Sequence, residues 1–264
     1  MSDTDAPVLL SREGAVAWIR FNRPAVLNAL DEPTAAALRA ACQAVADDAG
    51  VRCLVLAGNG RGFMAGGDVG RFHDDPAAAP AVATAIIDHL HAALRLLDGL
   101  AMPVLAAVQG PVAGAGMSLA CAADLCIAAD DALFTTAYAR LGTSPDGSGT
   151  HALPRLVGMR RAMELALLSE RVKADEALRL GLVNRVVPAA DLVPETRALA
   201  ERLAAGPTRA FAATRRLLRQ SWTATLDEQL DAERAAFQGC AATDDFREGV
   251  SAFLGKRAPV FQGR

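Results

Sequence analysis

The sequence is short of cysteine, of aromatic residues and of clustered basic charge, and each shortage excludes a class of protein. Aromatic residues make up 5% of the chain, and the net charge is −3 with both signs interspersed. No basic stripe offers a surface for nucleic acid. The cysteines are odd in number and lie among aliphatic residues, with no CxxC pair and no Cys/His metal spacing: Cys42, Cys53, Cys121, Cys126 and Cys240. We therefore expect reduced thiols in the core and no metal site.

Signals for secretion or for a membrane span are also missing. The N-terminal residues 1–7 are polar and acidic, without the cationic start and apolar block of a secretory signal. The most apolar stretch, Leu100–Ala129, is interrupted too often by proline, glycine and polar residues to cross a bilayer. We expect a cytoplasmic protein without membrane partners. Apolar residues form 52% of the 264 residues, which is ample for a buried core.

The periodicity of apolar residues predicts an α/β core followed by a helical C-terminal third. Strands are predicted at Val8–Leu10, Val16–Phe21, Arg52–Ala57, Pro103–Val108, Leu125–Ala128 and Val183–Val187. Helices are predicted at Asp31–Ala46, Val82–Leu97, Met117–Ala123, Arg160–Leu168, Ala174–Leu180, Glu195–Ala205, Thr208–Gln220, Leu226–Gln238 and Asp244–Leu254. Gly110–Gly116 is predicted to be a turn between a strand and a helix.

Two glycine-rich turns carry the first functional signal. Gly58–Asp68 follows a strand, and Gly110–Gly116 leads into a helix. Glycine allows a ligand to approach the backbone, and a helix start presents unpaired N–H groups. Two such turns facing one another would form an oxyanion hole. The spacing of the glycines is equally compatible with a purely structural role. A phosphate cradle is disfavoured because there is no GxxxxGK[ST] motif, and Phe63 occupies the third glycine position of a dinucleotide fingerprint.

Several motifs in order along nearly the whole chain resemble those of the crotonase (enoyl-CoA hydratase/isomerase) superfamily. They are Asn22–Pro24 with Leu27–Leu30, Gly62–Asp68, Pro103–Gly110, Gly114–Gly116, Leu153–Gly158, Ala174–Val186 and Phe246–Leu254.

This resemblance implies an α/β spiral of ββα units over residues 1–200 and a helical oligomerisation region over 201–264, giving a homotrimer or a dimer of trimers. It implies that the N–H groups of Gly67 and Ala115 hold the oxygen of an acyl-CoA thioester. Coenzyme A enters as part of the substrate, with no separate cofactor. It would lie along Ala25, Val26, Leu27, Asn28, Ala65, Gly66 and Asp68, and a neighbouring subunit would contribute Phe253 and Lys256.

The sequence departs from the hydratases of this superfamily. They use two glutamates to activate water, and the corresponding positions here are Ser118 and Tyr138. Neither side chain is a carboxylate base at neutral pH. Asp146 instead falls where several isomerases carry their acting aspartate, and the segments around it most resemble the isomerase of ring-epoxidised phenylacetyl-CoA. We therefore predict an acyl-CoA isomerase in which Asp146 moves a proton. The alternative for Asp146 is a structural turn acid.

Three other activities stay open. One is hydration of an enoyl-CoA, and another is binding of CoA esters without turnover. The third is halide displacement, because Asp146 and His91 also match the nucleophile and the histidine of a chlorobenzoyl-CoA dehalogenase. The tryptophans of that enzyme are replaced by Leu90 and Tyr138, which makes dehalogenation the lesser hypothesis. Tyr138, Gly114 and His91 are further candidate contacts of the acyl group.

Overall fold

The computed structural model describes residues 5–264, and residues 1–4 of the acidic N-terminal segment lie outside this description. A six-stranded sheet runs through the molecule in the order β1-β2-β3-β4-β6-β9. An antiparallel hairpin begins it, and the other neighbours pair in parallel. The strands are β1 (Val8–Glu13), β2 (Val16–Phe21), β3 (Cys53–Gly58), β4 (Val104–Val108), β6 (Leu125–Ala129) and β9 (Arg185–Val187).

A second sheet of three short strands has the order β5-β7-β8. Its strands are β5 (Pro111–Ala113), β7 (Leu133–Thr135) and β8 (Val172–Lys173). The chain passes from β4 to β5, through α4 (Ala115–Ala122) to β6, and on to β7, so consecutive strands alternate between the two sheets. This alternation is the ββα spiral that the resemblance implied, and the predicted fold class is confirmed.

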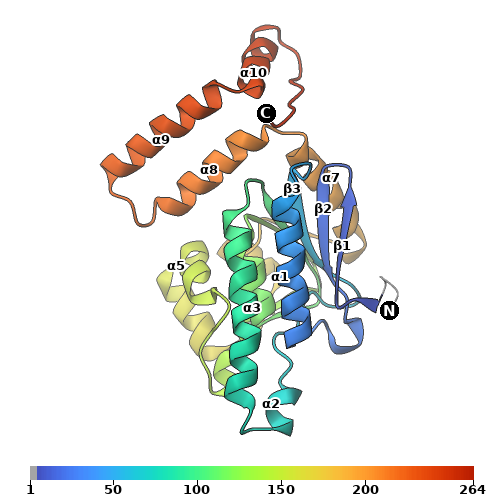
Figure 1. Ribbon diagram of the computed structural model, residues 1–264. Coiled ribbons are helices and arrows are strands. Elements are labelled where there is room, and N and C mark those ends of the chain that lie inside the picture. Colours follow the sequence, from blue (N-terminus) through green and yellow to red (C-terminus); the bar gives the residue numbers. More distant parts are fainter. Residues whose placement is uncertain (1–4) are drawn as a thin grey trace.

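Helices cover both faces of the larger sheet. On one face α1 (Glu32–Asp47) and α3 (Ala79–Gly99) lie side by side, while α7 (Leu192–Ala204) covers the other (Figure 1). Successive side chains of a strand point to opposite faces, so each central strand contributes side chains to two hydrophobic cores. In β3, Leu54 and Leu56 join the cluster under α1 and α3, whereas Cys53 and Val55 join the one under α7.

The last helices form an arm that projects from this core (Figure 1). It consists of α8 (Thr208–Gln220), α9 (Leu226–Ala241) and α10 (Asp244–Leu254). The division expected after residue 200 falls inside α7, whose Ala200 and Ala204 are still buried against the sheet. None of the helices within residues 5–264 is both long and apolar enough to cross a membrane.

The arm is attached to the core by a buried ion pair. Nε of Arg215 lies 2.6 Å from Oδ2 of Asp124, and the guanidinium also donates to the main-chain oxygens of Leu97, Asp98 and Leu100 at the end of α3. Burial raises the pKa of Asp124, and the charge of Arg215 opposes that rise. Since the guanidinium fork satisfies several acceptors at once, this contact fixes α8 on the sheet.

Two parts of the predicted secondary structure were wrong or incomplete. The predicted turn Gly110–Gly116 contains strand β5, and α4 begins at Ala115. β7, β8 and α2 (Gly70–Asp74) were not predicted, nor was the first half of α5 (Gly149–Leu168), which Gly158 interrupts with a φ of 77°. Strands of two or three residues are too short for an alternating pattern to appear. α6 (Ala174–Leu180) lies where it was expected.

Candidate active site

The first glycine turn leaves β3 at Gly58 and is held between two other segments. Met64 forms an isolated bridge with Val112, and Gly67 forms one with Leu30. Gly66 has a φ of 104°, a conformation that favours glycine. Gly67 is exposed, and a Cβ added to it would meet nothing within 4 Å. The backbone of Gly67 therefore borders open space.

The second turn starts helix α4. Gly114 has a φ of 50° and a ψ of −119°, and precedes Ala115, the first residue of the helix. A Cβ on Gly116 would lie only 2.5 Å from the main-chain oxygen of Met64. Glycine is therefore required there, because any side chain would push the two turns apart.

The structure brings the two predicted turns into contact. The N–H of Ala113 donates to the oxygen of Met64 at 2.9 Å, and a Cβ on Gly114 would lie 3.3 Å from the Cα of Gly66. Among residues 5–264, neither the N–H of Gly67 nor that of Ala115 donates a hydrogen bond. At Ala115 this follows from its place in the first helical turn, which has no partner within the helix. Two unpaired amides on adjoining turns are the main ingredient of an oxyanion hole.

A carboxylate, a phenol and a hydroxyl lie beside the second turn. The hydroxyl of Tyr138 donates to Oδ1 of Asp146 at 2.7 Å. A Cβ on Gly114 would lie 3.9 Å from Cζ of Tyr138, and one on Gly149 would lie 3.0 Å from Oγ of Ser118. Burial and the Asp146 charge raise the pKa of Tyr138, so its hydroxyl stays protonated and donates to the carboxylate.

His91 reaches the same loop from helix α3. Its Nε2 lies 2.6 Å from the main-chain oxygen of Asp146. The oxygen is only an acceptor, so Nε2 carries the proton in this contact. His91 therefore supports the backbone that presents Asp146, and this nitrogen is not available as a base.

The segments expected to border coenzyme A lie next to each other. The N–H of Ala65 donates to the oxygen of Leu27 at 3.0 Å, and that of Asp68 to the oxygen of Leu30 at 2.9 Å. Ala25 and Val26 are exposed. Together these segments form a continuous border on which a ligand could rest.

Asn28 and Asp68, by contrast, use their side chains within the protein. Asn28 is 1% exposed, and its amide donates to the main-chain oxygens of Asn59, Gly62 and Phe63. Asp68 lies 3.6 Å from Arg23, which also pairs with Asp31. The side chain of Asn28 is therefore not available to a ligand, and its N–H already donates to the oxygen of Arg23.

Phe253 and Lys256 are not brought to the site within one chain. Phe253 lies near the end of α10 at the outer end of the arm and is 84% exposed, and Lys256 follows it (Figure 1). Their expected role in binding the nucleotide therefore requires another copy of the chain.

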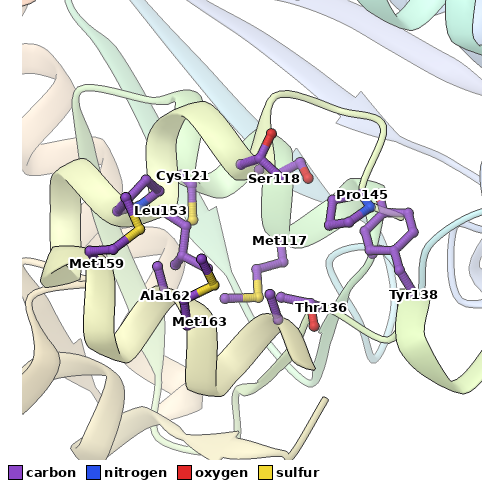
Figure 2. A pocket seen from close by; sticks show the side chains of 15 residues that line it. Met117, Ser118, Cys121, Thr136, Tyr138, Pro145, Leu153, Met159, Ala162 and Met163 are labelled. Atoms are coloured by element: carbon purple, nitrogen blue, oxygen red, sulfur yellow. The ribbon is translucent and has the colours of Figure 1, made fainter. Parts of the chain in front are cut away.

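A cavity of about 260 Å³ lies between α4 and α5, next to Ser118 and Tyr138 (Figure 2). Sequence reasoning missed most of its lining, which comprises Gly114, Met117, Ser118, Cys121, Thr136, Tyr138, Pro145, Gly149, Thr150, Leu153, Pro154, Met159, Ala162, Met163 and Ala166. The spacing of Met117 and Cys121 by one helical turn was a usable signal, since it places both on one face of α4.

Comparison with known proteins identifies the family. Residues 11–264 match the family model described as enoyl-CoA hydratase/isomerase. The chain is 43% identical over 250 residues to a probable enoyl-CoA hydratase of Rhodobacter capsulatus, covering 94% of this chain and 95% of that protein. It is 39% identical over 258 residues to the 1,2-epoxyphenylacetyl-CoA isomerase of Escherichia coli, covering 97% and 98%.

A solved structure agrees with these relatives. The crystal structure of a putative enoyl-CoA hydratase/isomerase from Mycobacterium abscessus matches with a TM-score of 0.92 and 37% identity, over 97% of this chain and 100% of the other. The resemblance drawn from the motifs is thereby confirmed. The chain belongs to the enoyl-CoA hydratase/isomerase family of the crotonase superfamily.

Proposed function

We propose that this enzyme is an acyl-CoA isomerase that shifts a double bond, or rearranges a ring epoxide, through a stabilised thioester enolate. The observation that supports this most directly is the single carboxylate of Asp146, held by Tyr138 beside the two glycine turns. Ser118 and Tyr138 stand where a hydratase would carry its two glutamates. One positioned carboxyl group is sufficient for an isomerase, because the same group can take a proton and return it.

In the double-bond shift, the proposed reaction has two proton transfers. The thioester oxygen accepts hydrogen bonds from the N–H groups of Gly67 and Ala115. Asp146 removes a proton from one carbon of the acyl group, and the electrons of the broken C–H bond move onto the thioester oxygen. The carboxyl then returns the proton to another carbon, which re-forms the carbonyl and moves the double bond. Each amide of an oxyanion hole lowers such a barrier by about 3 kcal/mol.

Replacement of the carboxylate tests the mechanism. Asp146→Asn should reduce turnover by about 10²- to 10⁴-fold, the contribution typical of a general acid–base, while the dissociation constant for the acyl-CoA stays nearly unchanged. Asp88→Asn, at an exposed position of the same helix as His91, is the matched control and should keep full activity. Unchanged turnover in Asp146→Asn would rule out the proposed proton shuttle.

Hydration is the second candidate, and the names of relatives such as the Rhodobacter protein support it. Incubation with crotonyl-CoA separates the two activities, since a hydratase yields a 3-hydroxyacyl product and an isomerase does not. The contact between Nε2 of His91 and the oxygen of Asp146 argues against a third activity, halide displacement with His91 as base. Binding without turnover is tested by the same substrates.

The proposed assembly is a homotrimer or a dimer of trimers with CoA bound partly by a neighbouring chain. Two features support it: the large apolar side chains exposed on the projecting arm, and the 84% exposure of Phe253 near the end of α10. Coenzyme A enters only as part of the substrate, and no separate cofactor is needed for the two proton transfers.

A further inference from the structure

The cavity between α4 and α5 has a reactive end and an apolar end. Gly114, Ser118 and Tyr138 line the part nearest the glycine turns and Asp146. The opposite part is lined by Met159, Met163 and other residues of α5. A volume of about 260 Å³ is below the 300–1,000 Å³ typical of complete small-molecule sites. It therefore suits one limb of a larger ligand.

The lining is apolar and rich in sulfur. Figure 2 shows four sulfur-bearing side chains around the same space: Met117, Cys121, Met159 and Met163. Burial raises the pKa of the Cys121 thiol to about 12, so it stays neutral. No residue lining the cavity carries an ionised side chain at neutral pH. A charged group placed here would therefore find no ionic partner among the lining side chains.

The position of the cavity identifies which limb of the substrate it accepts. Gly114 immediately precedes Ala115, whose N–H is unpaired, and Tyr138 contacts the carboxylate of Asp146. An acyl group with its thioester oxygen at this turn and its reacting carbons at Asp146 continues past Tyr138 towards the methionines. Methionine side chains adapt to different shapes and make favourable contacts with aromatic rings.

We propose that the cavity binds the acyl chain, and that the substrates are CoA esters of uncharged hydrocarbon acyl groups larger than the four-carbon crotonyl group. This inference rests on the proposed function for the placement of the thioester. Straight medium-length chains and aryl groups share the required chemistry, and acyl groups ending in a carboxylate are excluded. Ala166 and Met163 are then specificity-determining residues.

Binding of saturated, unreactive CoA esters tests the proposal without any turnover. Octanoyl-CoA and phenylacetyl-CoA should each bind at least about tenfold more tightly than butyryl-CoA, since each buried methylene improves binding by up to about fourfold. Glutaryl-CoA should bind less tightly than butyryl-CoA. Equal dissociation constants for butyryl-CoA and both larger esters would overturn the proposal.

Substitutions in the cavity test whether its lining causes the preference for larger acyl groups. Ala166→Leu adds a larger side chain to the lining of the cavity and should lower the ratio of octanoyl to butyryl affinity by about fivefold or more. Met163→Ala widens it and should favour octanoyl-CoA over phenylacetyl-CoA. Ala152→Leu, at another half-buried alanine of α5 outside the cavity, is the control and should leave all ratios unchanged.

Different results would contradict the isomerase proposal and the acyl-chain proposal. Asp146→Asn tests the chemistry and should retain the preference for large esters, because the cavity is intact. If size preference is absent in the parent protein and Asp146→Asn still abolishes turnover, the acyl-chain proposal is wrong and the isomerase proposal stands. If Ala166→Leu folds, by its circular dichroism, and keeps the parental ratio, the cavity is not the acyl site.

Discussion

His91 and Tyr138 hold the loop that carries Asp146 from two directions. Tyr138 holds the carboxylate of Asp146, and His91 holds its main-chain oxygen. Sequence patterns suggested a substrate contact for each, and in the structure both contact Asp146 itself. We therefore regard His91 as a positioning residue, whose loss should affect the geometry of the carboxylate more than the binding of the CoA ester.

Removal of His91 tests this positioning. His91→Ala should lower kcat by about two- to tenfold, the value of one lost hydrogen bond, with KM almost unchanged. His91→Gln keeps a donor and should restore part of kcat. His89→Ala is the control from the same helix, because Nδ1 of His89 is buried without a partner among the described residues. A kcat of His91→Ala equal to that of the parent would contradict the assignment.

Helix α10 holds the C-terminal segment that follows it. Glu248 accepts hydrogen bonds from Arg257 at 2.6 Å and from the N–H of Val260 at 2.8 Å. The buried Asp245 accepts from the N–H groups of Gln262 and Gly263. The arm therefore ends in an ordered strap folded back onto α10, and Lys256, the expected nucleotide contact, lies at its start.

The pKa of Glu248 makes this strap sensitive to acid. The hydrogen bonds from Arg257 and Val260 lower its pKa from 4.5 to about 2. A depressed carboxylate pKa contributes stability above the unfolded value, and that stability is lost as the pH falls from 4.5 towards about 2. Glu248→Gln should therefore speed amide exchange at Val260 several-fold at pH 6.

The difference between Glu248→Gln and the parent should shrink as both are measured at lower pH. Comparison at equal pH removes the intrinsic pH dependence of exchange. Glu233→Gln, at an exposed position of α9, is the control. In this variant the amide of Val260 should exchange at the same rate as in the parent protein. A variant difference that stays constant from pH 6 to pH 3 would show that the carboxylate does not hold the strap.

At the scale of the whole molecule, the arm exposes several large apolar side chains. Exposed side chains of the arm include Leu218, Trp222, Leu226, Leu230, Phe237, Phe253 and Leu254. Large contiguous apolar patches are typical of protein interfaces. The core below the arm also exposes Leu167 and Leu168 on α5, outside the cavity, so the proposed assembly can cover both regions.

Light scattering on the purified protein tests the assembly. The parent should have the mass of a trimer or of two trimers. Leu218→Asp places a charge on a side chain that is 66% exposed in one chain and should shift the mass towards monomer. Thr214→Asp, on an exposed position of the same helix, is the matched control. A monomeric parent protein would contradict the trimer and the proposed role of Phe253 together.

The longer elements were predictable because their patterns are local. The apolar runs of β2, β3 and β4 and the amphipathic periods of α8 and α10 lie within single stretches of sequence. The two glycine turns were also visible, since a backbone that must approach another closely requires glycine in the chain itself. The local patterns were enough to predict an α/β core, and the family followed from the resemblance of several motifs in order along the chain.

The contacts that assemble the candidate site could not be predicted from the sequence, because tertiary structure decides them. The contact of His91 with Asp146, the hydrogen bond from Tyr138 and the meeting of Gly66 with Gly114 join residues whose separation in the chain carries no periodic signal. The cavity needs one face of α4 opposite one face of α5, and only packing decides which faces meet. A sequence pattern indicates which side of a helix or strand is apolar. Which other element packs against that side is decided by the tertiary arrangement of the ββα units.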